Sequence, residues 1–166
     1  MSIQEAIYAR QATRSFTTEA VPEEKLQKII IAGQAAPVGM GQYENYHFTT
    51  ITSAAAIAKI EAAGSGHPYY GAPAVVIISI KNNGPMEQVS AGAMVENMAL
   101  LATEQDLASC VVAGALQPLL KDEKLASEIK IPAGFVPCIS LAVGYPKEHL
   151  KPAASNRHEV ASDDIN

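Results

Sequence analysis

The first third of the chain combines short stretches of helical periodicity with polar segments that have none. Residues 2–8 predict a short helix, because they begin with a serine and a glutamate at the spacing of a capping box. Residues 22–33 predict a second helix, since proline is tolerated at a first helical position and glycine commonly ends a helix. Between and after them, residues 10–16 and 35–45 are expected to be irregular. The apolar positions that share a face are Ile3, Ile7 and Tyr8 in the first helix and, as a buried stripe, Leu26, Ile29 and Ile30 in the second.

Four segments have the pattern of β-strands. Residues 46–52 alternate and are rich in aromatic and β-branched types, while residues 74–79 form an almost continuous apolar run. Such a run is typical of a strand that is buried on both faces of its sheet. Residues 109–112 and 137–143 predict two further short strands.

Three more helices are expected between these strands. An alanine-rich segment, 53–63, begins with a serine cap, and residues 118–129 predict a helix that is broken near Asp122. Residues 91–105 have the strongest helical pattern, with an apolar surface broad enough for a central helix or a subunit interface. That surface consists of Met94, Met98, Leu101, Val95, Ala99 and Ala102.

The order of these elements predicts a layered α+β or α/β fold with few strands. The absence of an internal repeat or linker places residues 1–166 in one domain. Four strands form a small sheet for so many helices, and a strand or tail supplied by a partner would enlarge the layered structure. This favours a homodimer.

Composition narrows the possible partners. Hydrophobic residues make up 48% of the chain and charged residues 17%, which indicates a large core or an apolar subunit interface. A net charge of −5 argues against nucleic-acid binding, which normally requires a basic face. No apolar run is long enough to span a membrane, and the polar, acidic start does not resemble a secretory signal. We therefore expect a cytoplasmic protein.

Familiar catalytic and metal-binding motifs are missing from the sequence. There is no HExxH, P-loop, GxSxG or GxGxxG motif, and the four histidines lack the spacing of metal ligands. Cys110 and Cys138 lie far apart, which predicts two core thiols rather than a disulfide or zinc site. No side-chain catalyst and no metal site are predicted, so any enzymatic activity would need a cofactor that carries the chemistry.

Three arginines are candidates for binding a phosphate group. Arg10 and Arg14 are four residues apart, and guanidinium groups match phosphate oxygens in a bidentate manner. Two arginines at this spacing are, on their own, more often a solvated surface pair. Arg157 lies in a polar tail that only a ligand or a partner would order.

Five segments, in order, resemble the nitroreductase family. Residues 10–16 resemble its opening arginine–serine signature, and residues 143–146 followed by Arg157 resemble its closing element. The other matches are residues 35–48, the "GAP" strand that starts at residues 70–73, and the long helix over residues 91–108.

The resemblance implies an α+β fold with a central, mostly antiparallel sheet flanked by helices, in an intertwined homodimer. It also implies FMN bound at the dimer interface, NADH or NADPH as the reductant, and a nitroaromatic, quinone or similar small molecule as the acceptor. By resemblance, Arg10 and Arg157 would hold the FMN phosphate, and Arg14 would lie near the N1/O2 edge of the flavin. The remaining cofactor-binding positions would be the main chain at Gln11 and Ala12, the loop residues Gly41 and Gln42, and the N5 loop of Val112, Ala113 and Gly114.

The sequence departs from the family pattern at several of these positions. Ala12 replaces the family's serine, Gly41 or Gln42 stands where the loop asparagine is expected, and Ala113 replaces an acidic residue. These departures keep open a flavin-binding sensor or storage protein without significant turnover. A non-flavin dimeric binding module with solvated arginines is a third hypothesis.

Overall fold

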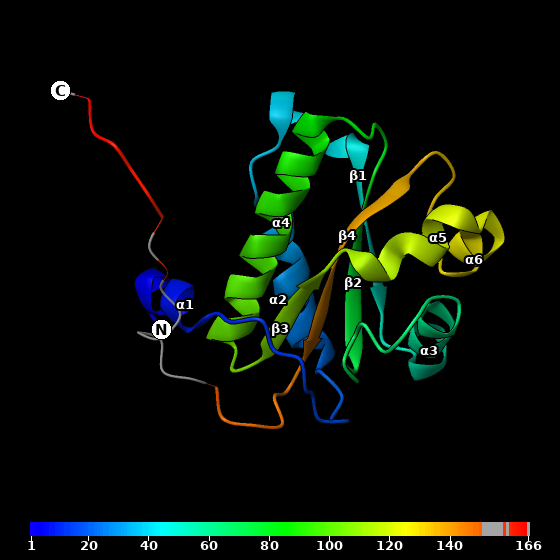
Figure 1. Ribbon diagram of the computed structural model, residues 1–166, viewed down its shortest axis with the longest axis horizontal. Helices are drawn as coiled ribbons and strands as arrows, with labels where there is room; N and C mark the ends of the chain where they lie inside the picture. Colours follow the sequence, from blue (N-terminus) through cyan, green and yellow to red (C-terminus); the bar gives the residue numbers. More distant parts are fainter. Residues whose placement is uncertain (151–157, 159, 166) are drawn as a thin grey trace.

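A four-stranded antiparallel sheet forms the centre of the computed structural model, which describes residues 1–150, 158 and 160–165 (Figure 1). The strand order is β1-β2-β4-β3, and all three neighbouring pairs are antiparallel. The prediction of a mostly antiparallel α+β fold is confirmed. The strands are β1 (Tyr46–Ile51), β2 (Ala74–Ile80), β3 (Ala108–Val112) and β4 (Val136–Gly144).

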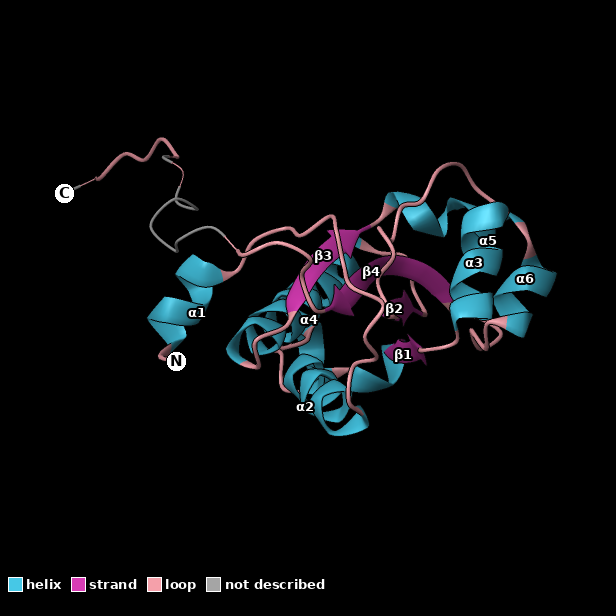
Figure 2. Ribbon diagram, turned by 90° about the horizontal axis from the view of Figure 1, so that it is seen from below, coloured by secondary structure: helices cyan, strands magenta, loops and turns pink. Residues whose placement is uncertain are grey.

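Helices cover both faces of the sheet. Two long helices, α2 and α4, pack on one face, whereas α3, α5 and α6 lie at the other (Figure 2). The first helix, α1, stands apart from the sheet and packs against α4. The helices are α1 (Ile3–Ala9), α2 (Glu23–Gln34), α3 (Ala54–Ala62), α4 (Pro85–Glu104), α5 (Gln117–Lys121) and α6 (Glu123–Glu128), with short 3₁₀ turns η1 (Gly39–Gly41), η2 (Tyr43–Asn45) and η3 (Gly114–Leu116).

Strand β2 divides the core into two clusters. Every residue of β2 is buried, as its continuous apolar sequence predicts. Val75 and Ile77 pack toward α3, α5 and α6, whereas Val76 and Ile78 pack toward α2 and α4. This alternation follows from the two-residue period of a strand.

Gly33 lies inside α2, so the prediction that it ends this helix is wrong. Helix α2 continues to Gln34. A Cβ atom at Gly33 would lie 2.1 Å from Cε of Met98 and 3.2 Å from the ring of Phe48. Glycine is therefore present at this position because α2 and α4 approach each other closely, and not because the chain turns there.

Helix α4 is longer than predicted. It begins at Pro85, whereas the periodicity indicated residue 91. The additional residues include Met86 and Val89, which are exposed, so they do not extend the buried stripe on which the prediction depended. A proline in the first turn is nevertheless a good start for a helix.

The predicted capping box and the predicted helix break are both confirmed. Ser2 Oγ accepts from the N–H of Glu5, and the N–H of Ser2 donates to the Glu5 carboxylate. Asp122 separates α5 from α6 and caps α6 by accepting from the N–H of Leu125. Over the described parts of the chain, no helix combines the length and apolar character needed to cross a bilayer.

Candidate functional site

The polar segment 10–16 lies along the free edge of β3. Ala12 forms an isolated parallel bridge with Ser109, and the N–H of Thr13 donates to the carbonyl oxygen of Ser109 at 2.9 Å. Phe16 is almost fully buried and anchors the end of the segment in the core. The segment therefore has a fixed course, with Arg10 at one end and Arg14 farther along β3.

Arg10 is held by an ion pair to the long helix. Its Nε lies 3.0 Å from Oε1 of Glu96 on α4. Both side chains are partly exposed, so the pair contributes little to stability. Among the described residues no further contact of the guanidinium is recorded, so the two terminal amino groups of Arg10 can make a bidentate contact with another anion.

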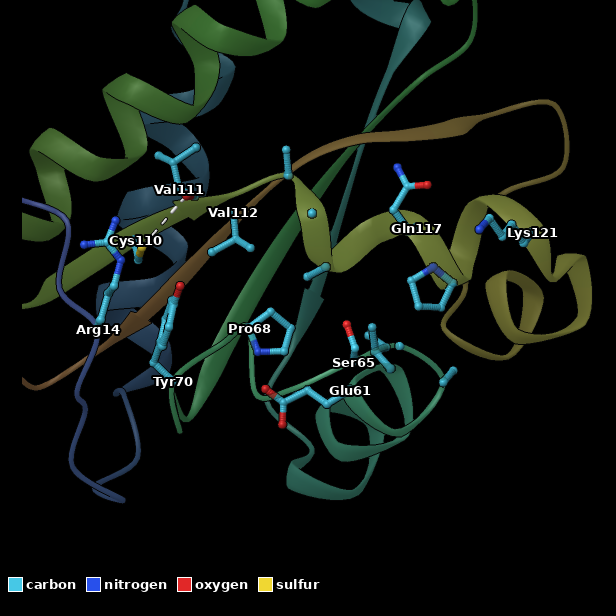
Figure 3. Close-up of a pocket in the computed structure, with 17 residues that line it drawn as sticks. Arg14, Glu61, Ser65, Pro68, Tyr70, Cys110, Val111, Val112, Gln117 and Lys121 are labelled. Carbon is cyan, nitrogen blue, oxygen red and sulfur yellow. Dashed lines mark hydrogen bonds between the residues drawn. The ribbon is translucent and has the colours of Figure 1, made fainter.

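A pocket of about 670 Å³ opens beside Arg14, between the end of β3 and the loop that joins α3 to β2 (Figure 3). This volume is within the range of small-molecule sites. Arg14 and Lys121 carry positive charge at its two ends, and Glu61 carries negative charge on the α3 side. The other lining residues are Ile60, Ala63, Gly64, Ser65, Pro68, Tyr70, Cys110, Val111, Val112, Ala113, Gly114, Ala115, Gln117 and Pro118.

One wall of the pocket exposes backbone to a ligand. A Cβ atom placed on Gly114 would meet no other atom within 4 Å, so a ligand can approach the chain closely there. Ala113 is the N-cap of η3 and Gly114 is its first residue, where backbone N–H groups lack an intrahelical acceptor. The hydroxyl of Ser140 donates to the carbonyl oxygen of Val112 and fixes this loop from behind.

The opposite wall is formed by the α3–β2 loop. Oε1 of Glu61 accepts from the N–H of Tyr69 at 3.1 Å, and Oε2 lies 3.2 Å from Nδ1 of His67. The Tyr69 side chain is fully buried, and this burial raises the pKa of its phenol. Tyr69 is therefore a neutral anchor at neutral pH, and Glu61 fixes the loop to α3.

The two cysteines are free thiols. Cys110 is buried at the back of the pocket and Cys138 is half-buried, as expected for core cysteines. Burial raises the pKa of both thiols, and the nearby Arg14 opposes this effect only partly at Cys110. Both thiols are protonated at neutral pH, so they are poor nucleophiles. The part of the chain that the structure describes contains no group of three His, Cys, Asp or Glu side chains placed to hold a metal ion.

The structure brings some of the predicted site residues together but not others. Arg14, Val112, Ala113 and Gly114 line the same pocket. Arg10, Gln11 and Ala12 lie on the segment that leads to it. The predicted Arg157 is outside the described residues.

Gly41 and Gln42 do not line this pocket. Both are exposed: Gly41 ends η1 and Gln42 joins η1 to η2. This loop packs on the first turns of α4 through a hydrogen bond from the Gly39 N–H to Ser90 Oγ. Strand β3 follows the other end of α4, so the helix separates this loop from Arg14 within one chain (Figure 1).

Sequence reasoning missed the second wall of the pocket. Tyr70, Glu61 and Lys121 come from three separate segments. Glu61 and Lys121 belong to no recognisable motif, and the resemblance at residues 70–73 marked the start of a strand without giving Tyr70 a role in the site. The turn-rich sequence from Gly64 to Gly71 predicts a loop but not its position beside β3.

A family model described as "Putative TM nitroreductase" matches residues 2–162. A nitroreductase with bound FMN from Bacteroides fragilis is 25% identical, with a TM-score of 0.82 over 100% of this chain and 98% of that one. A nitroreductase with bound FMN from Desulfitobacterium hafniense is 22% identical, with a TM-score of 0.80 over 97% and 100% of the two chains.

The name of a third similar structure mentions a nicotinamide nucleotide. It is a "Putative NADH dehydrogenase/NAD(P)H nitroreductase" from Bacteroides thetaiotaomicron, 18% identical, with a TM-score of 0.80 over 99% of this chain and 95% of that chain. None of the curated proteins matches this chain. The fold expected from the sequence resemblance is confirmed.

Proposed function

Because the chain belongs to the nitroreductase family, we propose that it is an FMN-dependent oxidoreductase that takes electrons from NADH or NADPH. Its acceptor is a nitroaromatic, a quinone or a similar small molecule, and residues 1–166 act as one domain. The observation that carries this proposal is the pocket in which a cation, Arg14, lies beside the exposed backbone of Val112 to Gly114.

The residues present fit FMN. The pocket is large enough for a planar three-ring system, and its lining mixes apolar side chains with a few polar groups. The space above Gly114 admits a flat ring against the backbone. Segment 10–16 leads away from this pocket toward Arg10, whose terminal amino groups suit a phosphate.

Bound FMN would supply the redox chemistry by accepting a hydride and passing it on. In this proposal Arg14 places a positive charge where the reduced flavin gains negative charge, which stabilises the reduced form. The backbone N–H groups at Ala113 and Gly114 act as donors toward the ring, and Arg10 and Arg157 hold the phosphate. No side-chain acid or base is required, in keeping with a pocket whose one cysteine is a buried, protonated thiol.

We further propose that the protein works as a homodimer in which a second copy completes the site. Gly41 and Gln42 lie away from the pocket of their own chain, so they can reach a flavin only in the partner's site. A single chain also exposes large apolar side chains on the helices of one side: Ile3 on α1 at 80%, Ile31 on α2 at 59% and Val89 on α4 at 71%. Exposed apolar residues on adjoining elements are typical of a subunit interface.

Val89→Asp is expected to weaken the dimer at least tenfold, because an unpaired carboxylate would be buried in the interface. An aspartate near the start of α4 is compatible with the helix, so the monomer should still fold. Sedimentation velocity over a range of protein concentrations measures the change. Leu120→Asp, at an exposed leucine on α5 across the sheet, is the matched control and should leave the dimer intact. A Val89→Asp protein that dimerises like the wild type would contradict this interface.

The proposed function is tested by a visible absorption spectrum of the purified protein, after FMN is added and the excess removed. We expect a retained yellow flavin that bleaches when NADH or NADPH is added without oxygen, and that regains its colour when a quinone follows. Flavin that binds but stays oxidised would favour the sensor or storage hypothesis. A protein that retains no flavin would contradict the proposal.

A further inference from the structure

The turn between α3 and β2 holds an aromatic residue in a backbone conformation that bulky side chains rarely adopt. Tyr70 has a φ of 56°, and Gly71 follows it with a φ of 77°, so two successive residues are left-handed. Glycine adopts this conformation freely, whereas the Cβ atom of a tyrosine crowds the neighbouring carbonyl group. The backbone alone would favour glycine or asparagine at position 70.

Contacts on both sides of Tyr70 hold it in this conformation. The preceding residue, Tyr69, is fully buried, and its N–H donates to Glu61. The N–H of Tyr70 donates to the carbonyl oxygen of His67, and the N–H of Ala72 donates to that of Tyr69, each at 3.0 Å. Strained residues that are fixed in this way by their surroundings tend to occur at functional sites.

The side chain of Tyr70 is directed into the proposed flavin pocket. It is half-buried and lines the pocket opposite the end of β3. Its ring stands between Arg14 and Pro68, with the hydroxyl end toward Arg14 and Val112 (Figure 3). The other non-glycine residues with positive φ in the described chain, Met40, Asp106 and Lys130, do not line this pocket.

From this geometry we infer that Tyr70 is a flavin-contacting residue, whose ring packs against the isoalloxazine across the pocket from Gly114. The inference rests on the proposed binding of FMN and adds a residue that was not among the site residues predicted from the sequence. A phenol ring presents a flat, apolar surface with a polar tip, which suits a planar heterocycle with polar edges. Because the ring already packs against the core cluster on the α3, α5 and α6 side, little side-chain freedom is lost on binding.

The emission of bound FMN tests this contact separately from activity. A phenol that touches the isoalloxazine quenches its fluorescence, because the phenol transiently donates an electron to the excited ring and recovers it on decay. A phenyl ring does not donate in this way. Tyr70→Phe should therefore raise the emission of bound FMN severalfold while the dissociation constant changes by less than about threefold, since the ring itself remains.

Tyr70→Asn tests the contribution of the ring to affinity. Asparagine tolerates the left-handed conformation, so the turn should persist. Without the ring we expect the dissociation constant of FMN to rise roughly fivefold to tenfold, as measured by titration. Lys130→Asn, at a left-handed position outside the pocket, is the matched control for the backbone change. Tyr145→Phe, on the α2 and α4 side of the core, is the control for the loss of a phenol.

Each outcome of these experiments supports or overturns the inference. If Tyr70→Phe leaves the emission as quenched as in the wild type, the ring does not touch the flavin and the inference is wrong, although FMN binding would stand. The same conclusion follows if a folded Tyr70→Asn protein binds FMN as the wild type does. If Tyr70→Asn does not fold, the emission of Tyr70→Phe decides. If the wild-type protein takes up no FMN, the proposed function fails and this inference fails with it.

Discussion

Arg10→Ala is expected to weaken FMN binding roughly 10- to 150-fold, which corresponds to about 1.5–3 kcal/mol for the loss of a charge-assisted hydrogen bond. In the proposed site the terminal amino groups of Arg10 hold the phosphate, while its Nε is bound to Glu96. The folded protein should tolerate the substitution, because a partly exposed ion pair contributes little to stability. Fluorescence titration of the apoprotein with FMN measures the affinity.

Glu96→Gln is the control that separates the two contacts of Arg10. The glutamine can still accept from Nε through its carbonyl oxygen, so the arginine should keep its orientation. We expect FMN affinity to change by no more than about threefold, since only the charge of an exposed partner is lost. If Arg10→Ala bound FMN as tightly as the wild type, the assignment of Arg10 to the phosphate would be wrong. An equal loss in both variants would instead show that the ion pair matters more than the phosphate contact.

Leu141→Ala should lower the free energy of unfolding by roughly 2–5 kcal/mol, the usual cost of truncating a leucine in a packed core. Leu141 is fully buried in β4, a strand paired on both sides, and its side chain belongs to the cluster formed with α2 and α4. Rigid strands around it cannot move in to fill the space, which leaves a cavity. Denaturant unfolding monitored by circular dichroism measures the difference.

Val111→Ala provides the comparison for Leu141→Ala. Val111 is the β3 residue paired with Leu141 across the sheet, but its side chain is partly exposed. We expect a loss of less than about 1 kcal/mol, because little apolar area leaves the interior. Both variants must be compared at one protein concentration, since association stabilises the folded state. Equal losses in the two variants would contradict the assignment of Leu141 to the core.

The elements that the sequence predicted best are those whose local pattern and whose packing agree. Strand β2 is continuously apolar and is buried on both faces, so its pattern alone identified it. The break at Asp122 was visible because a helix-capping side chain interrupts an otherwise helical segment. Gly33 was misread because a glycine that permits close packing of two helices looks, in sequence, the same as one that ends a helix.

The candidate site was only partly predictable, and the reason is also physical. Arg14 and residues 112–114 could be assigned to it because both segments resemble family motifs. The opposite wall depends on how the α3–β2 loop packs against β3, a long-range arrangement that no local pattern encodes. The left-handed conformation of Tyr70 was likewise invisible, since the residue type argues against it.

The position of segment 10–16 has a consequence for solubility. Strand β3 is at the margin of the sheet, and the hydrogen bond and bridge at Ser109 are made by the same stretch of chain that carries the two arginines. If that stretch were to detach, part of the edge of β3 would be left with unpaired backbone N–H and C=O groups. Such groups can pair with a strand from another molecule. Damage to segment 10–16 should therefore cause aggregation as well as loss of the proposed flavin. A ligand that holds this segment against β3 should protect the protein from aggregation.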